Sequence, residues 1–175
     1  MGLQTRFDLK KDGVAEIGKG FGIPKRFELE YDGPDVPYKV EMIVTWVAGR
    51  LLCASLTCTP KSDGEEVTGE GLRTIPVAGL IRAGVQGYLF RVTKVGRTTR
   101  MAPAILPSLE VSEGPTDEAL EWVAIVYRLA HATKFNPTKA VTEALRLPRS
   151  TAARWVMSAR TKGLLGPTTE GKAGG

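Results

Sequence analysis

Apolar and charged residues alternate in the sequence RFELEY, residues 26–31, which predicts a half-buried β-strand. Phe27, Leu29 and Tyr31 fall on one face of this strand, and charged residues fall on the other. The sequence DGP follows at once and predicts a turn. The strand is therefore expected to cover a core with one face and to meet water with the other.

Two longer apolar stretches continue this pattern. Residues 38–47 predict a second strand, residues 48–50 a turn, and residues 51–58 a returning strand. In the returning strand, strict alternation predicts one face made of Leu52, Ala54 and Leu56 and another made of Cys53, Ser55 and Thr57. The three strands together predict a small antiparallel meander.

A helix is expected after the meander, at residues 76–86, because its apolar positions recur at helical spacing. Pro76 suits the first turn of that helix and Gly87 suits its end. Residues 88–92 predict a short further strand, whereas the polar, glycine-rich residues 1–25 are expected to be loosely ordered in part. Residues 1–95 are thus interpreted as an α+β N-terminal domain.

The pattern changes after residue 95. Three prolines and little periodicity in residues 96–115 predict a linker, residues 116–166 predict an all-α domain of three helices, and the small, polar residues 167–175 predict a disordered tail. The expected fold class is α+β, with the meander and its one helix followed by the three-helix domain.

The three helices have clear start signals. Thr116 is a candidate N-cap for the first helix, and Asn136 followed by Pro137 is a favourable start for the second. Pro148 prevents the second helix from continuing, and Ser150 is expected to cap the third, which Gly163 ends. A projection at about 100° per residue places four residues of the third helix in the core, namely Ala152, Trp155, Val156 and Ala159.

Basic residues are concentrated around these helices. The whole chain has a net charge of +5, and residues 126–166 contain eight basic residues against one acidic residue, Glu143. A basic segment on a nearly neutral body is typical of a protein that binds nucleic acid, because phosphates attract it.

The segment from Pro148 to Val156, PRSTAARWV, resembles the turn and recognition helix of resolvases, transposases and homeodomain-like bacterial regulators, in which Ser-Arg-Ser-Thr-Val-x-Arg-Trp-Leu is common. The chain also resembles helix-turn-helix proteins of actinobacteria and their phages. The resemblance implies that Arg149, Ser150, Thr151 and Arg154 lie at the DNA and that Trp155 belongs to the core. The segment departs from the pattern at Pro148, which lies in the turn, and at Ala152, where a larger aliphatic residue is usual.

These observations predict a sequence-specific protein for double-stranded DNA, most simply a transcriptional regulator that reads the major groove with residues 150–162. A homodimer through the N-terminal domain is expected, because one such unit makes few base contacts. The alternative is a phage or mobile-element scaffold protein whose helices bind a protein partner. The residues expected to contact DNA are Lys139, Arg149, Ser150, Thr151, Ala153, Arg154, Met157, Ser158, Arg160 and Thr161.

The sequence offers little for other chemistry. With one histidine and two cysteines, Cys53 and Cys58, no zinc site, cofactor site or catalytic constellation is expected, and the thiols are interpreted as buried and structural. The stretch at residues 13–20 nearly spells a phosphate-binding loop, but Gly20 stands where that loop needs Ser or Thr. No apolar run approaches the roughly 18–20 residues of a membrane span, so a cytoplasmic protein is expected. Because no catalytic constellation is recognised, no enzymatic activity is expected.

Overall fold

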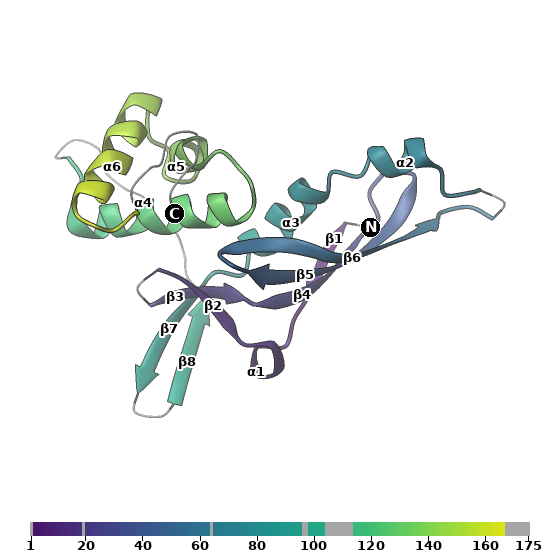
Figure 1. Cartoon of the computed structure of the whole chain (residues 1–175), viewed down its shortest axis with the longest axis horizontal. Helices are drawn as coiled ribbons and strands as arrows, with labels where there is room; N and C mark the ends of the chain where they lie inside the picture. Colours follow the sequence, from purple (N-terminus) through teal and green to yellow (C-terminus); the bar gives the residue numbers. More distant parts are fainter. Residues whose placement is uncertain (1, 19, 64, 96–97, 104–113, 167–175) are drawn as a thin grey trace. The chain divides into compact units, whose positions relative to one another are not determined.

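The computed structural model describes residues 2–18, 20–63, 65–95, 98–103 and 114–166 (Figure 1). Its elements form two compact units, each of which combines residues from distant parts of the chain. The sheet unit comprises residues up to 15 together with 23–89, and the helical unit comprises residues 16–22 together with 90 onwards. The chain has a mixed α+β fold, as expected.

The sheet unit is built on four antiparallel strands in the order β1-β4-β5-β6. They are β1 (Leu3–Arg6), β4 (Arg26–Tyr31), β5 (Tyr38–Val47) and β6 (Arg50–Pro60). The predicted meander of three strands is confirmed as β4, β5 and β6, and β1 extends it by pairing with β4.

One helix, α3 (Val77–Gln86), packs against the apolar face of this sheet. Phe27 and Leu29, on that face of β4, are each only 1% exposed. Gly84 permits the close approach, because a Cβ atom at this position would lie 2.6 Å from Leu29 Cδ1. The predicted helix at residues 76–86 is confirmed, with Pro76 as its N-cap residue and Gly87 as its C-cap residue. Two short helices, α1 (Leu9–Asp12) and α2 (Gly69–Arg73), complete the unit.

The expectation of loose order in residues 1–25 is wrong. Besides β1 and α1, this segment forms β2 (Val14–Gly18) and β3 (Phe21–Pro24), and all four residues of β3 are buried. Each of these two strands has only four or five residues, one of them glycine, so the sequence pattern is too short to identify a strand, although burial alternates along β2. β2 lies beside its sequence neighbour β3, and β3 in turn pairs with β7, which lies far away in the sequence.

The predicted faces of the returning strand are also wrong. A β-bulge shifts the register of β6 between Ile43 and Val44 of β5, so Cys53 pairs with Val44 and Cys58 pairs with Val40. One extra residue in a strand reverses the alternation beyond it. Both cysteines therefore lie on the same face of the sheet, and both are half-buried rather than fully buried.

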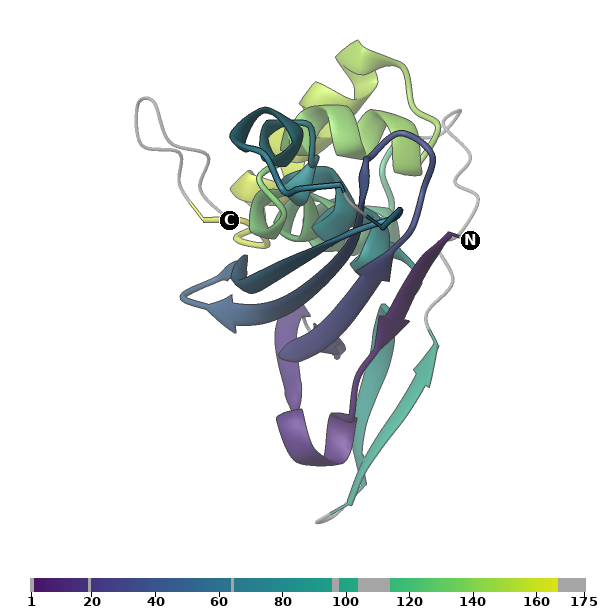
Figure 2. The same cartoon turned by 90° about the vertical axis from the view of Figure 1, so that its right-hand side faces the viewer.

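A second sheet has the strand order β2-β3-β7-β8, with β7 (Phe90–Val95) and β8 (Thr98–Pro103) forming an antiparallel ladder (Figure 2). The strand expected at residues 88–92 is present but shifted. Residues 98–103, expected in a linker, are instead a strand, while residues 96–97 and 104–113 lie outside the described part of the chain. The predicted tail, residues 167–175, also lies outside it.

Three helices follow, namely α4 (Asp117–Ala132), α5 (Pro137–Ala144) and α6 (Arg149–Thr161), and they pack against one another. The helices are confirmed, but the expected boundaries of an all-α domain at 116–166 are not those of the compact unit. Phe21, from the N-terminal segment, packs edge-on against Trp122 of α4 with ring centroids 4.8 Å apart. The apolar core of the helical unit thus includes strand residues as well as helices. In the described part of the chain, no helix combines the length and the apolar composition needed to span a membrane.

Candidate nucleic-acid interface

Side-chain caps fix the starts of α4 and α5. Thr116 Oγ1 accepts a hydrogen bond from the Ala119 N–H (3.1 Å), and Asn136 Oδ1 accepts one from the Lys139 N–H (3.0 Å). Pro137 occupies the first turn of α5. These hydrogen bonds confirm both predicted caps. Each cap satisfies an N–H group that has no partner within its helix.

Helices α4, α5 and α6 all end in the same way. A residue in the left-handed region follows each of them, and the next N–H donates to a carbonyl five residues back. The three left-handed residues are Lys134 (φ 55°), Arg146 (φ 52°) and Gly163 (φ 73°). Arg146 thereby reverses the chain between α5 and α6, and the leucines on either side of it, Leu145 and Leu147, are each 3% exposed. The turn is thus fixed by backbone hydrogen bonds and by buried apolar neighbours.

The start of α6 differs from the prediction. Pro148 occupies the N-cap position and Ser150 lies inside the first turn, so Ser150 is not the cap. In the part of the chain that the structure describes, no side chain caps the first N–H groups of α6. These groups carry partial positive charge, and here they lie beside the exposed Arg149.

One side of α6 forms the core of the three-helix packing. Ala152, Trp155, Val156 and Ala159 are between 0% and 3% exposed, which confirms the predicted core face. The Trp155 indole N–H is buried and has no hydrogen-bond acceptor among the described residues. The tryptophan therefore contributes apolar contact area but carries an unsatisfied donor, which opposes part of that gain.

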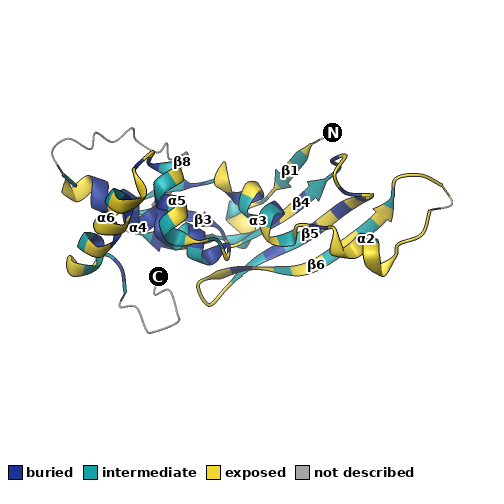
Figure 3. Ribbon diagram, turned by 90° about the horizontal axis from the view of Figure 1, so that it is seen from above, coloured by how far each residue is buried: buried dark blue, intermediate teal, exposed yellow. Residues whose placement is uncertain are grey.

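The opposite side of α6 faces outward and is small, hydroxylated and basic (Figure 3). Met157, the largest apolar residue on this side, is 62% exposed. Two hydroxyls are already engaged within the helix, since Ser158 donates to the Arg154 carbonyl (3.1 Å) and Thr161 to the Met157 carbonyl (3.2 Å). The structure thus brings together eight of the predicted site residues at the outward side and start of α6, namely Arg149, Ser150, Thr151, Ala153, Arg154, Met157, Ser158 and Thr161.

The two remaining predicted residues are used elsewhere. Arg160 is half-buried, and its Nη2 donates to Tyr127 Oη at 2.6 Å while its Nε donates to the Gly166 carbonyl at 3.2 Å. Its guanidinium also lies over the Tyr127 ring, 5.0 Å from the centroid. Lys139 lies on α5, where it pairs with Glu143 (3.6 Å). Arg160 therefore holds the segment after α6 in place and is not part of the outward side.

Arg128 has a comparable role, which the sequence pattern did not indicate. Its Nη1 donates to the Ile17 carbonyl of β2 at 3.3 Å, and its Nη2 donates to the Leu164 carbonyl. Burial lowers the pKa of its guanidinium. Arg128 thus connects β2, α4 and the segment that follows α6. A basic residue on a helix gives no sequence signal for main-chain carbonyls that lie so far away in the chain.

The basic residues of the helical unit divide into two groups. Arg128, Lys139, Arg160 and Lys162 have partners within the unit, Lys162 through an ion pair with Asp117. Within the described residues, no hydrogen bond or ion pair engages the side chains of Lys134, Arg146, Arg149 or Arg154, all of which are exposed. Two of these four residues, Arg149 and Arg154, belong to α6 itself, and Arg146 lies in the turn before it. The unpaired positive charge is therefore concentrated around the outward side of α6.

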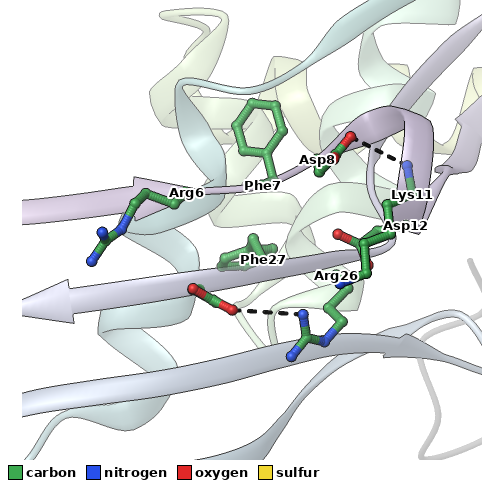
Figure 4. A pocket seen from close by; sticks show the side chains of 8 residues that line it. Arg6, Phe7, Asp8, Lys11, Asp12, Arg26 and Phe27 are labelled. Atoms are coloured by element: carbon green, nitrogen blue, oxygen red, sulfur yellow. Dashed lines mark hydrogen bonds and ion pairs between the residues drawn. The ribbon is translucent and has the colours of Figure 1, made fainter.

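The sheet unit contains a small pocket beside α1 (Figure 4). Four of its charged residues have partners: Asp8 caps α1 through the N–H groups of Lys10 and Lys11, and Arg26 pairs with Glu28 at 3.7 Å. Arg6, on its rim, pairs with Glu30. Paired charges thus make up most of the charged lining of this pocket.

The described residues also contain no group of three or more potential metal ligands. Burial raises the pKa of the Cys53 thiol, an effect that its contact with the Ser55 carbonyl partly offsets, and burial also raises the pKa of the Cys58 thiol. A raised pKa reduces the thiolate fraction near neutral pH, and the thiolate is the reactive form. Neither cysteine has the environment of a nucleophile.

The chain was compared with protein-family models, with curated proteins and with solved structures, and none of the three comparisons gives a match.

Proposed function

We propose that this chain is a sequence-specific protein for double-stranded DNA, that α5, its turn and α6 act as a helix-turn-helix, and that α6 reads the major groove. A regulator of transcription in the cytoplasm is the role that fits best. The observation that carries the proposal is the outward side of α6, which presents unpaired arginines among small side chains on a helix whose other side is fully buried.

The outward residues suit contact with base edges. Arg154 is exposed and unpaired, and a guanidinium can donate two hydrogen bonds to guanine O6 and N7. Ala153 beside it is small enough to let the helix approach the groove closely, and the exposed Met157 can contact a thymine methyl group. Arg154 therefore takes the central role in base recognition.

The charges at the start of α6 suit the phosphate backbone. Arg146 lies in the turn and Arg149 in the first turn of α6, both exposed. The uncapped N–H groups of the same turn add positive potential, as helix starts do where they meet phosphates. These groups would fix the register of the helix on the duplex without reading its sequence.

A titration of labelled duplex DNA selected from a random pool tests this proposal. Arg154→Ala is expected to weaken specific binding by roughly 10-fold to 100-fold, equivalent to about 1–3 kcal/mol, and affinity should fall steeply as salt rises. Arg73→Ala is the matched control, because it removes an exposed arginine from α2 of the sheet unit and changes the net charge equally. Absence of binding, or equal losses in the two variants, would contradict the proposal.

A scaffold that binds a protein partner is the second candidate, and the 62% exposure of Met157 is the observation that favours it. Trp155 cannot contribute to such an interface, since it is 1% exposed. Partner capture from host extract, with and without nuclease, separates the two functions. Loss of captured material after nuclease treatment favours DNA, while Met157-dependent capture that survives nuclease favours the scaffold.

A further inference from the structure

Strand β6 forms one edge of the sheet unit, with β5 as its neighbour on one side and no strand on the other among the described residues (Figure 3). It is 11 residues long, whereas β1 at the opposite edge has four residues. An edge strand presents backbone N–H and C=O groups that can pair with another chain. The longest open edge of this sheet is therefore β6.

This edge lacks most of the features that normally prevent pairing. Charged side chains usually protect an exposed edge, but none occurs between Leu51 and Pro60. Arg50 stands before this neutral run, and Lys61 after it is engaged by Asp32 (3.2 Å) and by the Gly33 carbonyl (2.6 Å). The bulge opposite Ile43 interrupts only the middle of the strand.

A row of apolar side chains along β6 also lacks full cover. Cys53, Leu56 and Cys58 face the same side as the core but are only half-buried. Their cross-strand partners on β5 are Val44, Met42 and Val40, which are 0%, 2% and 1% exposed. The core face of the sheet thus ends in a partly open apolar border along its β6 edge.

We propose that β6 pairs antiparallel with β6 of a second copy of this chain, which joins the two sheets into one of eight strands. A two-fold axis perpendicular to the sheet keeps each face on its own side, so the half-buried row of one copy meets the same row of the other. A second copy fits better than another occupant, because the edge carries no charge between Leu51 and Pro60 and the only open strand of equal length among the described residues is β6 itself. The pairing is independent of DNA binding, although it would supply two copies of α6 for two half-sites.

Two substitutions of leucine by lysine on the same strand test this interface. Leu56→Lys places a charge in the half-buried row, where pairing would bury it, and is expected to give a folded monomer of 18.9 kDa. Leu52→Lys is the control, since Leu52 is 36% exposed on the opposite face, and it should keep the wild-type mass of twice 18.9 kDa in light scattering. A monomeric wild type, or a Leu56→Lys variant that stays dimeric, overturns the proposal.

A second measurement does not depend on how Leu56→Lys folds. A variant with Cys53→Ser, Cys58→Ser and Leu56→Cys carries its only thiol near the middle of β6, close to the two-fold axis, and a short bifunctional maleimide should then link two copies through the half-buried row. Linked dimers are expected, and they should disappear when denaturant is added before the reagent. Failure to link the native protein counts against β6 pairing, while DNA titration of the same variant shows separately whether the proposed function holds.

Discussion

Both sides of α6 include arginine, but the arginines on the two sides have different roles. On the buried side, Trp155 is packed among the other helices, and Arg160 at the end of the helix binds Tyr127 and Gly166. On the outward side, Arg149 and Arg154 have no partner within the described residues. A count of basic residues therefore overstates the charge available to a ligand, because half of the eight cations in residues 126–166 are already engaged.

The largest expected effect lies on the buried side. Trp155→Ala should lower the free energy of unfolding by about 3–5 kcal/mol, because it leaves a cavity among three helices. Trp155→Phe should cost far less, at most roughly 1.5 kcal/mol, since it also removes the unsatisfied indole N–H. Urea unfolding followed by circular dichroism measures both. Equal losses would show that the indole nitrogen has a partner in solution.

The next test compares an engaged arginine with a free one. Arg128→Met should lower the free energy of unfolding by about 1–3 kcal/mol, because the carbonyls of Ile17 and Leu164 lose their donor. Arg154→Met on the outward side should change it by no more than about 0.5 kcal/mol. The same unfolding experiment serves for both variants. If Arg154→Met is equally destabilising, Arg154 is not free and the distinction between engaged and unpaired arginines fails.

The smallest expected effect belongs to Lys139, which forms an ion pair with Glu143 in which both side chains are exposed. A double-mutant cycle with Lys139→Ala and Glu143→Ala should give a coupling of about 0.3–0.5 kcal/mol that vanishes at high salt. A larger or salt-resistant coupling would place Lys139 among the structural cations. In that case Lys139 would no longer be a candidate for contact with DNA.

Helices with side-chain caps were predictable from sequence, because their signals are local. Thr116 and Asn136 each cap a helix through an N–H group three residues ahead, so the starts of α4 and α5 could be inferred without tertiary contacts. The core face of α6 followed from helical spacing alone. The prediction that Ser150 caps α6 was wrong, because the helix begins at Arg149, one residue after Pro148.

Features that depend on distant partners were not predictable. Strands β2 and β3 are too short to identify from their sequence pattern, and the bulge that reverses the face of Cys53 appears only in the register with β5. The engagement of Arg160 by Tyr127 joins residues on two different helices, so the predicted list of contact residues included an arginine that is not available. The outward position of Arg154 was inferred correctly because it needs only the helical period.

Phe21 is synthesised long before Trp122, the residue against which it packs. The ribosome makes Phe21 about a hundred residues before Trp122, which at roughly 5–20 residues per second corresponds to about 5–20 s. Throughout that interval the apolar side chains of the early segment have no cover from α4. A nascent chain that stalls before residue 122 therefore carries an exposed apolar strand that chaperones are equipped to recognise, and fragments that begin after residue 22 would lack this part of the helical core from the start.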